Sequence, residues 1–203
     1  MKKQKLVKQV SYLEAERDAL RAKNLSLNNA LNALRRDMKI LEKISLTDGL
    51  TGIGNRRAFS TAIRYATENY KHTGDKFALV VVDINDLKPI NDELGHEAGD
   101  TLIKSAASIL TNAARTTDGV FRLGGDEFSV ILNNTSNGLP FKNRIKELCT
   151  ASGISMASGW STISHLPYKL LSAEEIAEYL FKLADREMYS EKSMLKASRT
   201  IGR

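Results

Sequence analysis

The segment Arg122-Leu123-Gly124-Gly125-Asp126-Glu127-Phe128 combines a tight turn with two adjacent carboxylates, and the apolar run Phe128-Ser129-Val130-Ile131-Leu132 follows it. The paired glycines let the backbone reverse sharply and leave room for a ligand to come close. Adjacent acids on such a turn repel each other unless a positive charge, usually a metal ion, lies between them. The segment therefore predicts a turn that presents a cation site at the start of an apolar strand.

A further carboxylate, Asp83, ends a second apolar run that extends from Phe77 to Val82. If the two apolar runs form neighbouring antiparallel strands, Asp83 clusters with Asp126 and Glu127. Three carboxylates together need divalent cations, and all-oxygen ligation suits Mg²⁺ or Mn²⁺ with bound phosphates. Such ions lower the pKa of a hydroxyl nucleophile and neutralise a departing pyrophosphate. The alternative is a set of solvated turn acids.

The glycine-rich segment resembles the signature hairpin of the GGDEF family, the bacterial diguanylate cyclases, which condense two GTP molecules into cyclic di-GMP. The block from Asp83 to Asp100 extends the resemblance. It reads D-I-N-D-L-K-P-I-N-D-E-L-G-H-E-A-G-D and is similar to the family pattern D-x-D-x-F-K-x-x-N-D…G-H-x-x-G-D. Two positions depart from the pattern, since Asn85 replaces a common Asp and Leu87 replaces the usual Phe. Neither is an expected primary ligand.

The resemblance implies the metal ligands and the catalytic residues. Asp83, the Ile84 carbonyl, Asp126 and Glu127 would bind the metal. Asp126 and Glu127 would also help to generate the attacking alkoxide, and the sequence leaves open which of them is the base. Lys88 would meet phosphate charge in the transition state, with an ordinary surface role as its alternative.

The resemblance also implies the residues that bind the nucleobase. Asn91 and Asp100 would read the guanine edge, and His96 is grouped with the substrate-binding residues, with turn stabilisation as its alternative. A carboxylate can accept hydrogen bonds from both N1–H and the 2-amino group of guanine, and adenine lacks that pair of donors. We therefore expect the site to reject ATP. Satisfying a helix dipole is the alternative role for Asp100.

The stretch from Ala184 to Lys196 resembles the family segment A-D-x-A-L-Y-x-A-K. Lys192 and Lys196 are four residues apart and so share a helical face, from which both would reach the β- and γ-phosphates of the substrate. The family usually has Gly-Arg where this chain has Leu195-Lys196. Lysine keeps the charge but loses the bidentate fork of arginine. A solvated cationic helix end is the alternative.

Two further pairs match the family. Arg115 and Asp118 match its R-x-x-D inhibitory site, in which Arg stacks on guanine and binds phosphate while Asp accepts from a guanine edge. The resemblance thus implies that cyclic di-GMP is an inhibitor as well as the product. Asp48 and Arg122 are expected to form the family's structural pair between the linker and the hairpin.

Residues 1–47 contain neither Gly nor Pro, and leucine recurs at every seventh position. The resulting seam predicts a long coiled-coil helix. Asn24 on the seam favours a parallel two-stranded coil, and Arg17 argues against higher-order packing. The alternative is a single amphipathic helix that lies on its own domain. The seam leucines are Leu6, Leu13, Leu20, Leu27, Leu34 and Leu41, and the other seam positions are Val10, Arg17, Asn24, Leu31, Met38 and Ser45.

The net charge of +6 is confined to this segment. Residues 1–47 hold eleven Lys and Arg against five Asp and Glu, whereas residues 48–203 hold nineteen of each. The globular part therefore has no basic character that would indicate nucleic-acid binding. A basic zipper that binds DNA is disfavoured, because no long Arg-rich reading helix precedes the leucines. The longest apolar run is too short to cross a bilayer, no signal peptide is predicted, and the single Cys149 fits a reducing cytoplasm.

Mixed strands and helices around a central hairpin predict an α+β fold of the nucleotidyl-cyclase, palm-like type. It would be a mainly antiparallel sheet flanked by helices and preceded by the coiled-coil helix. The expected domains are a dimerisation helix at 1–47 and a catalytic domain at 48–203. The expected elements are helices at 58–70, 87–94, 98–114, 143–150 and 173–196, and strands at 77–83, 128–132 and 154–160.

The sequence therefore predicts an Mg²⁺-dependent diguanylate cyclase that acts as a homodimer through a parallel coiled coil. It would bind neither nucleic acid nor membrane and would reside in the cytoplasm. The rival hypotheses are a non-catalytic cyclic di-GMP receptor and a dimerising scaffold. The intact run from Gly124 to Phe128 counts against a receptor, because such receptors usually carry a decayed hairpin.

Overall fold

The computed structural model describes residues 2–165 and 171–201 of the 203-residue chain. The chain divides into two compact units, Met1–Ser45 and Leu46–Arg203, and each is described here by itself. None of the helices in the described ranges is long and apolar enough to cross a membrane.

The first unit is built from one helix, α1 (Lys2–Leu46). Its side chains from residue 16 to residue 38 are exposed along their whole length, including every seam residue in that range. Leu20 is 56% exposed and Leu34 is 58% exposed, so the apolar stripe is not buried within this helical unit over residues 16–38. An uncovered heptad stripe is consistent with a coiled-coil segment. The side chains of Leu6, Val10 and Leu41 lie outside the described part.

The second unit contains a four-stranded antiparallel sheet, which confirms the predicted fold class. The strand order is β2-β3-β1-β4, so β1, the most apolar strand, lies in the interior of the sheet. All eight residues of β1 are buried, in keeping with its run of apolar side chains. The strands are β1 (Phe77–Ile84), β2 (Gly119–Gly124), β3 (Glu127–Asn133) and β4 (Met156–Thr162).

Helices cover both faces of this sheet. They are α2 (Arg56–Thr73), α3 (Leu87–Leu94), α4 (His96–Ala113), α5 (Leu139–Ser152), the short 3-10 helix η1 (Ile163–His165) and α6 (Ala173–Ile201). The helix α2 begins two residues before the predicted start, because the Asn55 side chain accepts hydrogen bonds from the N–H groups of Arg57 and Ala58 at 3.0 Å each. Such N-caps fix where a helix begins.

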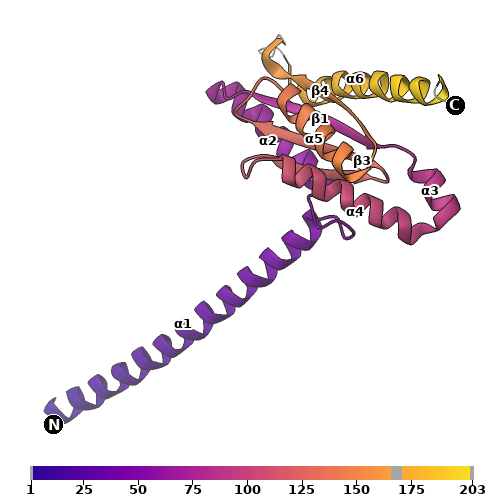
Figure 1. The fold of residues 1–203 in the computed structure, drawn as a ribbon. Helices are drawn as coiled ribbons and strands as arrows, with labels where there is room; N and C mark the ends of the chain where they lie inside the picture. The colour runs from indigo at the N-terminus through magenta and orange to yellow at the C-terminus, as the bar shows by residue number, and fades with distance from the viewer. Residues whose placement is uncertain (1, 166–170, 202–203) are drawn as a thin grey trace. The chain divides into compact units, whose positions relative to one another are not determined.

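The alternation of side chains along β1 separates two cores. Ala78, Val80 and Val82 pack with α4 and α5 on one face, whereas Phe77 and Leu79 pack with α2 and α6 on the other. Figure 1 shows α4 and α6 on opposite sides of the strands. Because side chains alternate, the odd-numbered residues of β1 all face α2 and α6.

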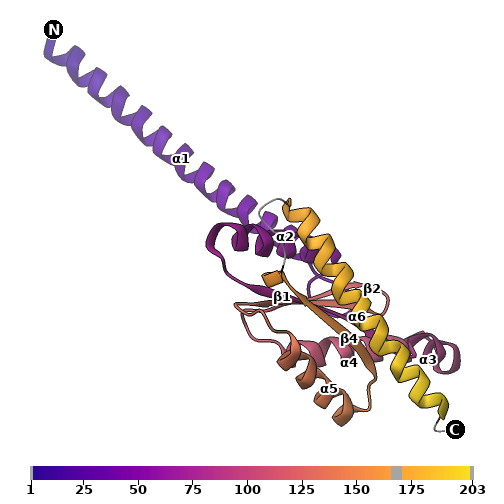
Figure 2. The same cartoon turned by 90° about the horizontal axis from the view of Figure 1, so that it is seen from above.

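The outer strand β4 has its free edge covered by side chains of α6, which runs alongside it (Figure 2). The carboxylate of Glu191 accepts from the Ser158 backbone N–H at 2.7 Å, and that of Glu187 accepts from the Trp160 N–H at 2.8 Å. Lys142 of α5 pairs with both carboxylates, at 3.5 Å and 3.0 Å respectively. An uncovered edge would leave these donors open to pairing with another chain.

Candidate active site

The turn between β2 and β3 depends on its two glycines. Gly124 has φ +145° and Gly125 has φ +52°, backbone conformations that L side chains rarely adopt. A register shift between Arg122 and Gly124 accompanies the turn. A side chain at either glycine would therefore strain the reversal that brings Asp126 and Glu127 to the start of β3.

Arg122 holds the turn from behind. Its Nε and one terminal nitrogen donate to the Gly125 carbonyl at 3.1 and 2.9 Å, and the other terminal nitrogen lies 3.2 Å from both carboxylate oxygens of Asp48. The predicted pair between the linker and the hairpin is thus confirmed. Burial opposes ionisation of Asp48, but hydrogen bonds from Thr51 and then from Arg122 outweigh it and hold the pKa of Asp48 below its usual range.

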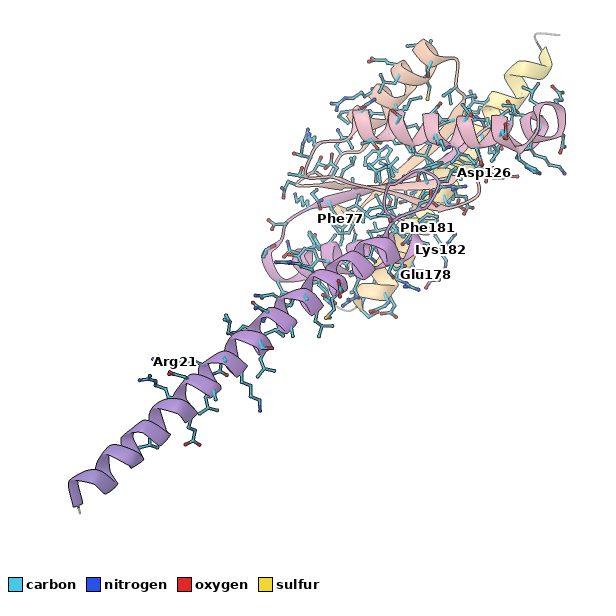
Figure 3. All side chains as sticks on the ribbon, turned by 90° about the horizontal axis from the view of Figure 1, so that it is seen from below. Arg21, Phe77, Asp126, Glu178, Phe181 and Lys182 are labelled. Carbon is cyan, nitrogen blue, oxygen red and sulfur yellow. The ribbon has the colours of Figure 1, made fainter. Side chains whose placement is uncertain are left out.

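The predicted antiparallel pairing of the two carboxylate-bearing strands is present. Asp83 of β1 is the direct partner of Glu127 of β3, so both side chains lie on the face that α2 and α6 cover. The Ile84 N–H donates to the Asp126 carbonyl at 3.1 Å, which fixes the backbone of Asp126 against the end of β1. Figure 3 labels Asp126 at this end of the sheet. The pairing brings Asp83, Ile84, Asp126 and Glu127 to one end of the sheet.

Both of the paired carboxylates have a cationic neighbour. Lys192 of α6 places its ammonium nitrogen 2.5 Å from Asp83, with side chains that are 23% and 12% exposed. Arg56 of α2 lies 3.5 Å from Glu127, where both side chains are more than half exposed. The first pair is held in a largely dry place and the second is open to water, so the Asp83–Lys192 pair is the stronger of the two.

These pairs bear on whether the residues fit a divalent metal. In the ranges that the structure describes, no three His, Cys, Asp or Glu side chains converge into a metal-holding group. The donors at this end of the sheet are nevertheless all oxygens, and the Lys192 ammonium lies where positive charge is stabilised by Asp83. Oxygen donors of this kind suit a hard divalent cation. The oxygen donors therefore fit a divalent metal ion, which would replace the Lys192 ammonium group beside the Asp83 carboxylate.

The predicted nucleobase residues lie at the junction of α3 and α4. Asn91 has a buried Oδ1 atom for which no hydrogen-bond partner is found among the described residues. A Cβ atom at Gly99 would lie 1.9 Å from this oxygen, so the glycine leaves the room that the Asn91 side chain fills. Buried polar atoms without partners are uncommon and mark places where a ligand or water can bind.

The neighbouring charged residues are open to solvent. Asp100 lies on the exposed side of α4 in the turn after Gly99, and Lys88 and His96 are exposed on α3 and at the start of α4. The structure therefore places Asn91 and Asp100 close together in the fold. Among the residues that the structure describes, no side-chain hydrogen bond or ion pair restrains Lys88 or His96. Lys196 belongs to α6, but its side chain lies outside the described part.

Arg115 and Asp118 lie in the loop that follows the end of α4. Asp118 accepts from the Arg115 backbone N–H at 2.9 Å and from the Asn133 N–H at 3.1 Å, so its carboxylate shapes the loop. Both residues line a cavity of about 200 Å³ together with Arg144, whose guanidinium donates to the Ala113 carbonyl at 2.6 Å. A second arginine in this cavity was not predicted from the sequence.

Sequence reasoning also missed Arg56 and the two glutamates of α6. Arg56 lies in an Asn-Arg-Arg run just before the predicted helix at 58–70, and nothing local indicates that it reaches Glu127. Glu187 and Glu191 stand where the family segment has alanine, and this departure was a signal that could have been used. Cys149 lies buried in α5, and burial raises the pKa of its thiol to about 11, as expected for a cysteine that packs in the core.

Comparison with known proteins agrees with this geometry. The family model described as "Diguanylate cyclase, GGDEF domain" matches residues 45–197. The diguanylate cyclase DgcS of Shewanella oneidensis is 30% identical over 176 residues, which cover 83% of this chain and 56% of DgcS. The diguanylate cyclase DgcP of Pseudomonas aeruginosa is 30% identical over 82% of this chain and 26% of its own length. The chain thus spans about half, or less, of these curated relatives.

Among solved structures, the coiled coil and GGDEF domain of DgcB from Caulobacter crescentus, in complex with c-di-GMP, has a TM-score of 0.72. The match covers 86% of this chain and 94% of that chain at 24% identity. At this identity the likeness concerns the fold, and it extends over most of both chains.

Proposed function

We propose, from the premise that this chain belongs to the GGDEF family, that it is a diguanylate cyclase which condenses two GTP molecules into cyclic di-GMP and releases two pyrophosphates. The observation that carries the proposal is the pairing of Asp83 with Glu127 beside an intact Gly-Gly turn. That pairing gathers carboxylates of two strands on one face at the sheet end, where a phosphate-bound cation needs them.

In this proposal the residues of the chain divide the work. Asp83, the Ile84 carbonyl, Asp126 and Glu127 hold a divalent cation, Mg²⁺ or Mn²⁺, which supplies charge neutralisation for the phosphates when bound. Asp126 or Glu127 takes the proton from the 3′-hydroxyl that attacks the α-phosphate of the second GTP. The base and two of the ligands would thus come from the turn between β2 and β3, and the other two ligands from the end of β1.

The remaining residues bind the substrate. Lys88, Lys192 and Lys196 would neutralise phosphate charge, and Lys192 is already on the same face as Asp83. Asn91 and Asp100 would read guanine, and the unpartnered Oδ1 of Asn91 supports a polar ligand at that place. His96 would lie at the edge of the same site.

Dimerisation would complete the catalytic unit. One chain binds one GTP, and the product needs two GTP molecules held face to face. We propose that residues 1–47 form a parallel two-stranded coiled coil and that residues 48–203 form the catalytic domain. Support comes from the exposed leucine stripe of α1. Linking two half-sites in this way raises their effective concentration.

The decisive experiment incubates purified protein with GTP and Mg²⁺ and resolves the nucleotides by chromatography. Cyclic di-GMP should form with the native chain and with the control Asp75→Asn, which changes an exposed turn aspartate. It should fall by at least a hundredfold with Asp126→Asn, since a misplaced or missing charged group at a reacting centre costs about that much. ATP in place of GTP should give no cyclic product. If native protein that is dimeric gives no cyclic di-GMP, the cyclase proposal fails.

A second function, binding of cyclic di-GMP as inhibitor or as signal, is favoured by the cavity that Arg115 and Asp118 line with Arg144. Guanidinium groups bind phosphate and stack on guanine. Calorimetry with cyclic di-GMP should show binding that Arg115→Ala weakens at least tenfold, and the same variant should lose product inhibition. Binding in a chain that makes no product would move the proposal to a receptor.

A further inference from the structure

A second, larger cavity lies between α2 and α6, on the sheet face that also carries Asp83. Its volume is about 660 Å³, within the range of small-molecule sites. The floor is apolar and includes Phe59, Phe181 and Leu123. The rings of Phe59 and Phe181 meet edge to face with centroids 6.2 Å apart. We call it the α2–α6 cavity.

The aromatic floor is open to solvent although it could hold an apolar ligand. Phe59 and Phe181 are both only half-buried, and each packs against the buried core that contains Leu123. Covering apolar surface yields about 25 cal/mol for each Å² removed from water. A flat apolar group of the size of one or two rings would therefore gain free energy by entering this cavity.

The charges around the cavity select the kind of ligand. The α2 wall carries three arginines, Arg56, Arg57 and Arg64. The α6 wall carries Glu174 and the pair of Lys182 and Glu178, whose charged atoms lie 2.6 Å apart and so offset each other. Figure 3 shows Glu178, Phe181 and Lys182 grouped on α6. Four cations and two acids line the cavity, and three of the cations are on the α2 wall. Two of these arginines have exposed acidic neighbours outside the cavity, Arg64 with Glu68 at 3.2 Å and Arg56 with Glu127 at 3.5 Å, and such exposed pairs are weak.

Arg56 connects this cavity with the hairpin formed by β2 and β3. Its Nε donates to the Leu123 carbonyl at 2.7 Å, and a terminal nitrogen lies 3.5 Å from the Glu127 carboxylate. Both partners of the ion pair are more than half exposed, so the pair is weak and exchangeable. An anion in the cavity would compete with Glu127 for the same guanidinium.

We propose that the α2–α6 cavity binds an aromatic anion, a carboxylate, sulfonate or phosphate on a flat apolar body, and that Arg56 transmits its binding to the hairpin. The rings lie on Phe59 and Phe181 and the anionic group on the α2 arginines. Binding itself is independent of the cyclase activity. Binding of the anion would draw the Arg56 guanidinium away from the Glu127 carboxylate. The effect of this loss on catalysis rests on the proposed function.

The binding test uses 8-anilinonaphthalene-1-sulfonate, an aromatic sulfonate that fluoresces in apolar surroundings, with the full chain and no GTP. We expect saturable binding of one probe per chain. Ala177→Phe fills the cavity, and Arg64→Glu reverses one charge of the α2 wall. Each should weaken the probe about tenfold, the equivalent of one lost contact of about 1.4 kcal/mol. Arg186→Glu makes the matched charge reversal at an exposed site on α6 outside the cavity and should leave the affinity unchanged.

The same titration separates this cavity from other places where the probe could bind. Excess cyclic di-GMP should not displace the probe, whereas displacement would assign the signal to the Arg115 site and overturn the proposal. Binding to the exposed leucines of α1 would be insensitive to Ala177→Phe and Arg64→Glu, and that result would overturn it as well.

The coupling test follows the amide signals of Gly124 and Gly125 by NMR, a readout that needs no catalysis. The probe should shift both signals in the native chain, and in Arg56→Met it should still bind but leave them in place. Probe binding that leaves both signals unmoved in the native chain would overturn the coupling. If the protein makes no cyclic di-GMP but binds the probe and shows the two amide shifts, the cyclase proposal is refuted and the proposal for the α2–α6 cavity stands.

Discussion

Replacing Lys192 by alanine should destabilise the globular unit, because it removes a cation that pairs with the largely buried Asp83 carboxylate. Asp83 is 8% exposed, and its side chain is held by the Lys192 ammonium at 2.5 Å. Breaking a buried pair from one side costs about 3–5 kcal/mol. Since the Lys192 side chain is 23% exposed, we expect a loss below that range, about 2–3 kcal/mol after discounting for solvent screening. For a unit of this size the melting temperature should fall by about 4–12 °C.

The assay is thermal unfolding followed by circular dichroism at one fixed protein concentration, since dimerisation makes the melting temperature depend on concentration. Lys182→Ala, an exposed lysine of the same helix, is the matched control and should change little. The double variant Asp83→Asn with Lys192→Met should recover most of the lost free energy of unfolding, because it places no charged side chain at either of these two positions. A double-mutant cycle then gives the coupling between the two residues, expected at about 1–3 kcal/mol.

Adding a divalent cation extends the same experiment. If the site binds Mg²⁺ through Asp83, Mg²⁺ should raise the melting temperature of Lys192→Ala more than NaCl of equal ionic strength does. A cation at ten times its Kd stabilises by about 1.4 kcal/mol. The double variant should show no such specific effect. Melting of Lys192→Ala within one degree of the native chain would refute the argument that this pair stabilises the fold.

Three other predictions concern the covered edge of β4, the Asp48 contacts and the coiled coil. Glu191→Ala should lower the free energy of unfolding in urea by about 2 kcal/mol, because the Ser158 N–H loses a charged acceptor, whereas Glu178→Ala should have a much smaller effect; equal effects would show that the edge contact is unimportant. Hydrogen bonds from Thr51 and then from Arg122 hold the pKa of Asp48 low, so these contacts stabilise the fold fully above the unfolded-state pKa of 3.8 and lose that effect as the pH falls through the lower folded-state pKa. The loss of stability on acidification should therefore be smaller in an Asp48→Asn variant, and parallel acid-unfolding curves would contradict this. Leu20→Pro with Leu27→Pro should turn a dimer into a monomer in analytical ultracentrifugation and lower the specific activity at low protein concentration, and a dimer of full activity would refute the coiled coil.

Local patterns were sufficient for much of this fold. The apolar run from Phe77 predicted β1 almost to the residue, and the polar-apolar pattern of Leu87 to Leu94 predicted α3 with its observed ends. These two elements were predictable because each depends on residues that are neighbours in the sequence. The approach of Asp83 to Glu127 was expected only on the condition that their strands are antiparallel neighbours, and the structure meets that condition.

Contacts that depend on tertiary position could not be read in the same way. Lys192 and Asp83 are 109 residues apart, and their contact depends on how α6 packs on the sheet. Glu187 and Glu191 have a role only because β4 is the outer strand, a fact of sheet order that no local pattern in β4 contains. The role of Arg56 could not be predicted for a related reason. Arg56 belongs to no local sequence motif, and it contacts a hairpin that is distant in the sequence.

The covered edge of β4 has a consequence for how the protein is assembled. The helix α6 follows β4 in the chain, so all four strands are synthesised before Glu187 and Glu191 of α6. Until α6 docks, the Ser158 and Trp160 donors are open, and a nascent chain is exposed to mispairing with its neighbours. The same docking step brings Lys192 to Asp83. The docking of α6 therefore covers the edge of β4 and completes the Asp83–Lys192 pair in a single step. A molecule in which α6 has not docked lacks both the covered edge and the ion pair.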